Sequence, residues 1–393
     1  MNARDLDALD AADPLAGFRH AFDLPEGVIY LAGNSLGALP KAAAERLKAV
    51  AGSEWGGALV TAWTERGWID APARVGGKIA GLIGAAPDEV IAADSTSVNL
   101  FKLIVAAMSA APDRKTLLGV TGDFPTDAYV GQGAVDLLGG GRRLKLVDRS
   151  GLEAAIDRDV ALVLLTHVNF RTAEVFDIEA VSARARAAGA MTLWDLSHSV
   201  GAAPVDLGGA GADLAVGCGY KYLNGGPGAP AWLYVAREHH GRLSSPLTGW
   251  MGHASPFDFA PGYRPAAGIA RFLCGTPPIL GLAALEAAIE LQLEAAPAEP
   301  WRKARALGDL FLELAAKCCP GLEPVCPGPG AVRGGHVAFR HPRAAAVSQA
   351  LIARGVIRDV RGDLLRFGLS PLYVGYAEVG RAVEVLGSVV EAG

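Results

Sequence analysis

Residues 212–228, with the sequence ADLAVGCGYKYLNGGPG, place one lysine, Lys221, between an apolar strand and a glycine-rich turn. A second apolar run covers residues 191–196, with Asp195 near its end and His198 two residues after it. Polar side chains that follow parallel strands meet at one edge of the sheet. The amine of Lys221 and the carboxylate of Asp195 are therefore expected to lie close together.

The surrounding chain alternates short apolar runs with helical patterns, which is typical of an α/β fold with a mostly parallel sheet. A further apolar run, 231–235, follows the turn at 225–230 too closely for a helical crossover, so we expect it to run antiparallel. The expected parallel strands are 117–120, 144–147, 160–168, 191–196 and 214–216.

The length of 393 residues indicates two lobes. Residues 1–40 resemble an arm with a short strand at 28–31. The pattern is helical from Lys41 to about residue 110, and we expect a large domain over 41–278. A smaller α+β domain is expected over 279–393, packed with the arm and beginning with a helix over 280–293.

A lysine and an aspartate at neighbouring strand ends are the pair that a pyridoxal phosphate (PLP) site requires. PLP forms a Schiff base with a lysine amine, and an acidic partner keeps the pyridine nitrogen protonated so that the ring accepts electrons. The sequence therefore predicts Lys221 as the covalent tether and Asp195 as the acidic partner. A lone lysine after a strand is also compatible with a solvated surface position, so other motifs must support this interpretation.

Further polar and aromatic residues follow the other strands. Thr96 and Ser97 begin an apolar helix, where free backbone N–H groups can hold a phosphate, although an ordinary helix cap has the same pattern. An aromatic ring at a strand exit can stack on a flat cofactor. The strand ends and late loops contribute Phe124, Asp127, Asn169, Thr172, His198, Tyr220, Trp250 and Thr276. Arg366, between apolar residues, either clamps a substrate carboxylate or forms a surface ion pair.

Composition narrows the possible partners. The net charge is −5 and no basic block occurs, which argues against nucleic acid and anionic membranes. Five cysteines without zinc spacing indicate neither a disulfide framework nor a metal site, and they fit a reducing cytoplasm. The acidic N-terminus lacks a signal region, and no apolar run is long enough to span a bilayer. A small soluble ligand is favoured.

With these motifs in place, the chain resembles kynureninase, a PLP enzyme of the aspartate-aminotransferase type of fold. The resemblance runs from YLAGNSLG at 30–37 to RFGLSPLY at 366–373. It implies a large seven-stranded sheet domain and hydrolysis of L-kynurenine to anthranilate and L-alanine. It also implies a homodimer, because Trp250 and Thr276 reach the phosphate site of the partner subunit in that family. Lys221 would tether PLP, Asp195 would pair with its ring nitrogen and Phe124 would stack on the ring. Thr96, Ser97 and Tyr220 would bind the phosphate, Asp127 and His198 would line the pocket, and Arg366 would hold the substrate carboxylate.

Two details qualify the resemblance. Ala32 stands where bacterial members often carry an acid. Animal members that prefer 3-hydroxykynurenine carry a histidine in the region 59–68 and an asparagine at the position of Thr276. This chain has neither, which favours unsubstituted kynurenine.

Trp68 is expected to pack on the aniline ring of the substrate. Tyr220 is expected to act as the acid that protonates the β-carbon after the Cβ–Cγ bond breaks.

Three other functions share part of the pattern. A cysteine desulfurase has the same lysine, aspartate and phosphate site, but such enzymes resemble one another in a Ser-His-Lys motif where this chain has Gly219-Tyr220-Lys221. A non-catalytic homologue would not need the full set of chemical residues. A nicotinamide-dependent dehydrogenase would need a Gly-x-Gly-x-x-Gly unit after its first strand, which the glycines at 225, 226 and 228 do not form.

Overall fold

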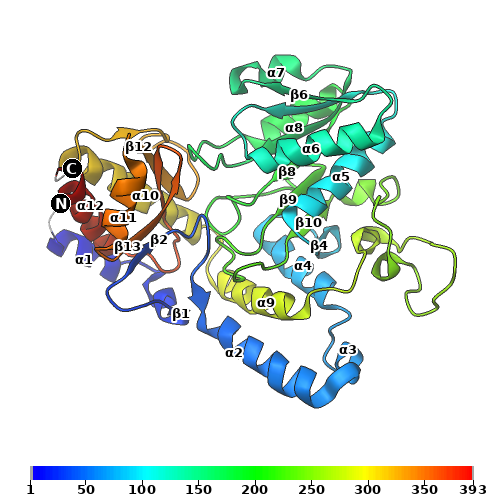
Figure 1. Cartoon of the computed structure of the whole chain (residues 1–393), viewed down its shortest axis with the longest axis horizontal. Helices are drawn as coiled ribbons and strands as arrows, with labels where there is room; N and C mark the ends of the chain where they lie inside the picture. The colour runs from blue at the N-terminus through cyan, green and yellow to red at the C-terminus, as the bar shows by residue number, and fades with distance from the viewer. Residues whose placement is uncertain (1–2, 392–393) are drawn as a thin grey trace.

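The computed structural model describes residues 3–391, and these form two lobes with a separate sheet in each (Figure 1). The lobe built around the seven-stranded sheet contains the middle of the chain. The other lobe carries a five-stranded sheet and both ends of the chain. None of the helices within residues 3–391 combines the length and apolar character needed to cross a lipid bilayer.

The large sheet has the order β4-β10-β9-β8-β7-β5-β6, and every strand except β10 runs in the same direction. The antiparallel direction of β10 confirms the prediction from the short connection before it. The strands are β4 Val90–Ala92, β5 Thr116–Val120, β6 Arg143–Val147, β7 Val160–Thr166, β8 Met191–Asp195, β9 Leu214–Gly217 and β10 Trp232–Val235.

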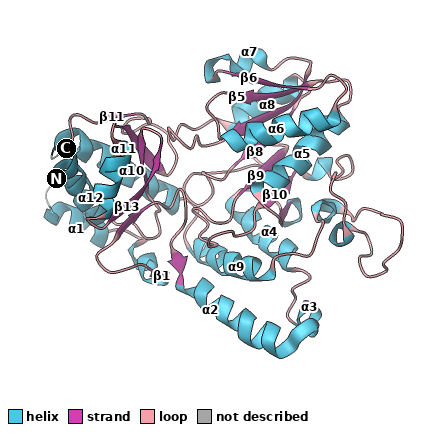
Figure 2. Cartoon of the chain, in the orientation of Figure 1, coloured by secondary structure: helices cyan, strands magenta, loops and turns pink. Residues whose placement is uncertain are grey.

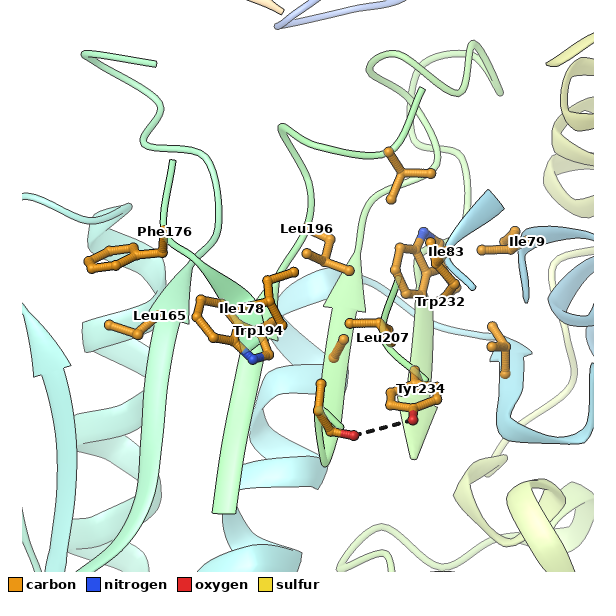
Figure 3. Packing of buried hydrophobic residues seen from close by; sticks show 14 of the residues in the cluster. Ile79, Ile83, Leu165, Phe176, Ile178, Trp194, Leu196, Leu207, Trp232 and Tyr234 are labelled. Carbon is orange, nitrogen blue, oxygen red and sulfur yellow. Dashed lines mark hydrogen bonds between the residues drawn. The ribbon is translucent and has the colours of Figure 1, made fainter. Parts of the chain in front are cut away.

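Successive residues of these strands pack on opposite faces of the sheet, because side chains alternate along a strand. Leu193 and Leu233 contribute to one apolar cluster, whereas their neighbours Trp194 and Trp232 belong to the other. Figure 3 shows Trp194 and Trp232 within the second cluster, together with Tyr234, whose hydroxyl donates to the carbonyl of Ala212 at 3.2 Å. Burial on both faces explains why the strands other than the exposed edge strand β6 are almost entirely apolar.

Helices cover both faces of the large sheet (Figure 2). Buried residues of α5 and α6 pack in one cluster, and those of α4, α7, α8 and α9 pack in the other. The helices of this lobe are α4 Ala71–Leu82, α5 Thr96–Ala110, α6 Pro125–Leu138, α7 Leu152–Ala155, α8 Ile178–Ala187 and α9 Ile279–Glu294.

The five-stranded sheet has the order β11-β12-β14-β13-β2, so a strand of the N-terminal arm completes the sheet of the C-terminal segment. β2 pairs in parallel with β13, with Tyr30 opposite Ile357. The strands are β2 Ile29–Leu31, β11 Glu323–Pro324, β12 His336–Arg340, β13 Val356–Arg361 and β14 Leu364–Gly368. Its helices are α1 Ala3–Ala11, α10 Glu299–Cys318, α11 Ala344–Ile352 and α12 Tyr376–Glu391. A short pair, β1 Phe22–Asp23 and β3 Leu39–Pro40, precedes α2 Lys41–Ala49.

The structure differs from the expected pattern at three places. The stretch from Lys41 to residue 110 is not helical throughout, since it contains β4, a short edge strand that pairs only with β10. A π-helix, Val50–Ala58, follows α2, and Leu59 then takes a positive φ of 53°. Helix α9 packs on α2 and α4 of the large lobe, although the expected small domain begins at residue 279. We propose that the division between the lobes follows α9.

Candidate active site

The carboxyl ends of β5, β7, β8 and β9 lie along one edge of the large sheet, because these strands are parallel neighbours. Asp195 is the last residue of β8 and pairs in register with Val216 of β9. Lys221 follows β9 by four residues. The strand geometry thus brings the lysine and the aspartate to one region, as the sequence predicted.

Lys221 is buried, and its Nζ lies 2.9 Å from Nε2 of His198, which is buried as well. The same Nζ lies 5.7 Å from the centre of the Phe124 ring and 5.8 Å from that of Tyr220. Burial, reinforced by the nearby Lys221 cation, lowers the pKa of His198 well below its ordinary value. The imidazole is therefore neutral at physiological pH and can exchange a hydrogen bond with the lysine amine.

Three carboxyl groups, those of Asp127, Asp123 and Asp195, form a cluster in this region, and the charge of Lys221 acts on Asp127. Burial, followed by the charges of Asp195 and Asp123, raises the pKa of Asp127 well above its ordinary value. Burial also raises the pKa of Asp123 to about 6. Asp195 accepts the backbone N–H of Ser197 at 2.8 Å. Such a cluster of acids is electrostatically costly in isolation, so it favours a ligand that brings a positive charge or a hydrogen-bond donor.

Two buried polar atoms near Lys221 lack hydrogen-bond partners among residues 3–391. They are Oδ1 of Asp127, whose Oδ2 accepts from Thr166 at 3.2 Å, and Nδ1 of His198. Unsatisfied buried polar atoms are uncommon in folded proteins and indicate a missing partner. A bound group with polar atoms of its own fits this environment.

The start of α5 is the region where the sequence predicts a phosphate cradle. Ser95 caps the helix by accepting the N–H of Val98 at 3.4 Å, which leaves the partly exposed Thr96 and the exposed Ser97 available for a ligand. Asp94, directly before the cap, has a positive φ of 50° and forms an ion pair with the buried Lys102. Lys102 also donates to the carbonyl of Phe272 at 2.6 Å, so one amine joins the cradle to the segment that leads to Thr276.

Arg366 enters from the small lobe on β14 and is almost fully buried, with 1% exposure. Its guanidinium donates to the carbonyl of Phe170, to the hydroxyl of Ser35 and to the carboxylate of Asp359. Phe170 in turn packs edge to face on Phe124, with the ring centres 5.2 Å apart. Arg366 is therefore a buried residue next to the cofactor-stacking candidate, and not a surface ion-pair residue.

The chain is similar to known kynureninases over nearly its whole length. A family model described as the kynureninase C-terminal domain matches residues 301–386. Kynureninase from Pseudomonas fluorescens is 48% identical over 392 residues, which cover 98% of this chain and 94% of that protein. Kynureninase from Burkholderia mallei is 46% identical over the same shares.

The chain belongs to the kynureninase family. The solved structures that it resembles agree with this fold. A cysteine desulfurase from Thermococcus onnurineus has a TM-score of 0.81 at 20% identity and covers 96% of this chain. A C-DES mutant with glycine covalently linked to the PLP cofactor has the same TM-score at 17% identity and covers 94% of this chain. At these identities the likeness concerns the fold alone, and it confirms the predicted fold class.

The predicted site residues of this kynureninase-family chain fall into two groups. Contacts of the described residues join Lys221, His198, Tyr220 and Phe124, and the charges of Asp195 and Asp127 act on each other. Thr172 lies on the loop after β7, where its hydroxyl donates to Glu174 at 3.0 Å.

The remaining predicted residues have other neighbours within this chain. The indole of Trp68 donates to Glu54 at 2.7 Å and packs on Trp63. Trp250 stacks edge to face with Phe257, and Thr276 is exposed. These positions leave their roles at Lys221 as predictions.

Sequence reasoning missed three residues of the kynureninase-family site. Ser35 belongs to the Gly33–Gly37 motif, which could have indicated it. Asp359 lies in a stretch of alternating charge, RDVR at 358–361, that resembles an ordinary edge strand. His336 is the first residue of β12, and no local sequence pattern marks it. It is fully buried, its ring centre lies 5.8 Å from that of His198, and both of its ring nitrogens lack partners in the described structure.

Proposed function

We propose that this chain hydrolyses the Cβ–Cγ bond of L-kynurenine and releases anthranilate and L-alanine, with PLP as its cofactor. The observation that carries the proposal is the buried Lys221 amine, which lies 2.9 Å from a neutral His198 and interacts electrostatically with Asp127 of the carboxyl cluster, in a kynureninase-family chain. A reactive lysine in a partly desolvated site is the requirement of PLP chemistry.

The residues present fit that cofactor. Asp195 would pair with the pyridine nitrogen and Phe124 would stack on the ring. Thr96, Ser97 and Tyr220 would hold the phosphate. Burial is the main cause of the raised pKa of Asp127, and a protonated pyridine would offset the carboxylate repulsion that adds to it. Polar atoms of the cofactor would give partners to Asp127 Oδ1 and His198 Nδ1. When bound, PLP supplies an electron sink for the bonds broken at the substrate carbons.

The side chains of this chain supply the proton transfers. The amine of Lys221, once free, would remove the proton from the substrate α-carbon. Burial raises the pKa of Tyr220 to about 12, with a further contribution from Cys218 and Asp195. Its hydroxyl therefore stays protonated at neutral pH and can donate a proton to the β-carbon after the Cβ–Cγ bond breaks. Water adds to the γ-carbonyl and provides the oxygen of the anthranilate carboxyl group.

Substrate binding would depend on Arg366, whose buried guanidinium suits the α-carboxylate. We expect Trp68 to contact the aniline ring. Without a histidine in 59–68, and with threonine at 276, the chain should prefer unsubstituted kynurenine to its 3-hydroxy form.

The homodimer is part of the proposal. Trp250 and Thr276 lie on loops that pack on each other, since the N–H of Met251 donates to the carbonyl of Cys274 at 3.2 Å. Large apolar side chains are exposed near the first loop, with 58% exposure at Phe257 and 77% at Phe259. Such residues are typical of an interface. We place this dimer in the cytoplasm, where its five free cysteines would remain reduced.

A cysteine desulfurase is the second candidate, because the solved structures with the same fold include such enzymes. That reaction needs a mobile nucleophilic cysteine. Cys274 is instead followed by Gly275-Thr276-Pro277-Pro278, and its sulfur lies 3.7 Å from a carboxylate oxygen of Asp94.

The test is a cuvette experiment with the purified PLP-loaded protein and Lys221→Ala as its control. L-Kynurenine is added while anthranilate fluorescence is recorded, and L-cysteine is added separately while sulfide is measured. Anthranilate from the wild type alone would support the proposal. A yellow protein that leaves kynurenine intact would overturn it, and sulfide release would support the desulfurase. Failure to bind PLP would indicate a non-catalytic homologue.

A further inference from the structure

Asp359 is the counter-ion of the Arg366 guanidinium. Nη2 of Arg366 donates to the Asp359 carboxylate, and Nη1 donates to the carbonyl of Phe170. The Arg366 side chain is 2% exposed and that of Asp359 is 9% exposed. A cation this deeply buried needs a partner, because an unpaired charge in the protein interior is strongly destabilising.

Ser35 ties the ion pair to the N-terminal arm. Its hydroxyl donates to the same carboxylate oxygen of Asp359 that pairs with Arg366, and it accepts from Nη2 of Arg366 at 3.2 Å. The guanidinium is thus held by three segments that are distant in sequence, namely the arm, the loop after β7 and strand β13. Three fixed partners leave a planar guanidinium little freedom to rotate.

At least one donor of Arg366 is not used. Its Nε is buried and has no hydrogen-bond partner within the described chain. A guanidinium carries five N–H donors, so a ligand carboxylate could bind this free Nε–H. A second bond could replace the 3.2 Å contact with Ser35 while the ion pair with Asp359 stays intact.

Arg361 adds a second positive charge to the ion pair of Arg366 and Asp359. Its Nη1 donates to the other carboxylate oxygen of Asp359 at 2.5 Å, and its side chain is 49% exposed. Two cations and one anion leave a net positive charge next to the free Nε–H. An incoming carboxylate is therefore still attracted, although Arg366 already has an acidic partner.

We propose that Asp359 is the positioning residue for substrate binding, and that it holds the Arg366 guanidinium in the orientation that receives the α-carboxylate of the amino-acid substrate. This inference rests on the proposed function and extends it to a residue that does not touch the substrate. Burial lowers the pKa of Arg366 and Asp359 opposes that change, so the aspartate also keeps the guanidinium charged.

The test compares Asp359→Ala, Asp359→Asn and Asp359→Glu in the PLP-loaded enzyme. Asp359→Ala removes the acceptor and should raise KM for L-kynurenine by about 10- to 100-fold, with kcat changed far less. Asp359→Asn keeps an oxygen acceptor at the same place but not the negative charge, so it should raise KM less than Asp359→Ala does. Asp359→Glu keeps the charge balance that the fold needs but displaces the carboxylate, so it should also raise KM.

A substrate analogue without the α-carboxylate, the corresponding amine, separates positioning from general damage. Its inhibition constant should be the same in wild type and in the three variants. Asp363→Ala is the matched control, because Asp363 pairs with Arg340 at 3.0 Å in an exposed part of the same lobe, and its KM should be unchanged.

The proposal is overturned if Asp359→Ala and Asp359→Glu both keep the wild-type KM, or if binding of the amine weakens in parallel with KM. Arg366→Ala distinguishes the substrate-binding role of Arg366 from the positioning role of Asp359. If Arg366→Ala keeps the wild-type KM, the carboxylate assignment of Arg366 is wrong. If it raises KM and the Asp359 variants do not, only the positioning role fails. If the wild type leaves kynurenine intact, the proposed function itself is at fault.

Discussion

Nε2 of His198 lies 2.9 Å from Nζ of Lys221, with both side chains buried at the edge of the large sheet. The pKa of His198 is well below its ordinary value because of burial and the adjacent cation. A neutral imidazole in this place can accept a hydrogen bond from the lysine amine through one ring nitrogen and donate a hydrogen bond to a ligand through the other. The pair therefore links the proposed tether to the proposed cofactor pocket.

Replacing His198 tests this link. His198→Ala removes a buried hydrogen-bonding partner and should weaken PLP affinity by about tenfold or more. His198→Gln can still form a hydrogen bond with the Lys221 amine, so its PLP affinity should lie between that of His198→Ala and that of the wild type. Absorbance titration of the apoprotein with PLP measures both affinities, and wild-type affinity in His198→Ala would contradict the assigned contact.

Asp123 gives the stability of the apoprotein a defined pH dependence. Burial raises its pKa to about 6 from an ordinary value of 3.8. The folded state therefore binds this proton more tightly than the unfolded state. The resulting stabilisation is fully present below about pH 4 and is lost as the pH rises through 6.

Asp123→Asn cannot ionise, so it should be more stable than the wild type at pH 8 by about 1 to 3 kcal/mol, with the gain shrinking towards pH 4.5. Urea denaturation of the apoprotein across this pH range measures the difference. Asp136→Asn, at an exposed position on α6, is the control and should change the free energy of unfolding by less than about 0.5 kcal/mol. A pH-independent difference for Asp123→Asn would contradict the raised pKa.

Gly37 fixes the arm against the lysine loop. Its N–H donates to the carbonyl of Tyr220 at 2.8 Å. A Cβ at this position would collide with the carbonyl of Lys221 and would lie 2.8 Å from the Cα of Asn224. The absence of a side chain is therefore a packing requirement, since neither backbone can move freely.

Gly37→Ala should lower the free energy of unfolding by about 1 to 3 kcal/mol and should weaken PLP binding, because the shift would be transmitted to Lys221. Gly17→Ala is the matched control, since a Cβ there meets no atom of the described chain within 4 Å. Thermal unfolding and PLP titration of both variants test the contact. Equal behaviour of the two variants would show that the arm does not constrain the lysine.

The sequence was informative where chemistry and strand pattern coincide, and less so where long-range pairing decides the structure. The strand around Leu214 and the lysine after it were predictable, because an apolar run and a glycine-rich turn are local signals. The edge strand Val90–Ala92 was not, since three apolar residues between helices also suit a helix. The role of Asp359 could not be predicted either, for another reason. Its role depends on Ser35 and Arg366, and no local pattern brings these segments together.

The proposed dimer predicts that two inactive variants can restore each other. Lys221→Ala lacks the tether, whereas Trp250→Ala lacks a residue that we expect to complete the partner's phosphate site. In a mixed dimer, the subunit with intact Lys221 receives Trp250 from its partner, so one of its two sites is whole.

Unfolding and refolding an equal mixture should therefore recover about a quarter of the wild-type activity, since half of the dimers are mixed and each has one intact site. Each variant refolded alone is the control and should remain inactive. No recovery in the mixture, with dimers confirmed by size-exclusion chromatography, would mean that Trp250 acts within its own subunit. High activity of Trp250→Ala alone would remove this residue from the site.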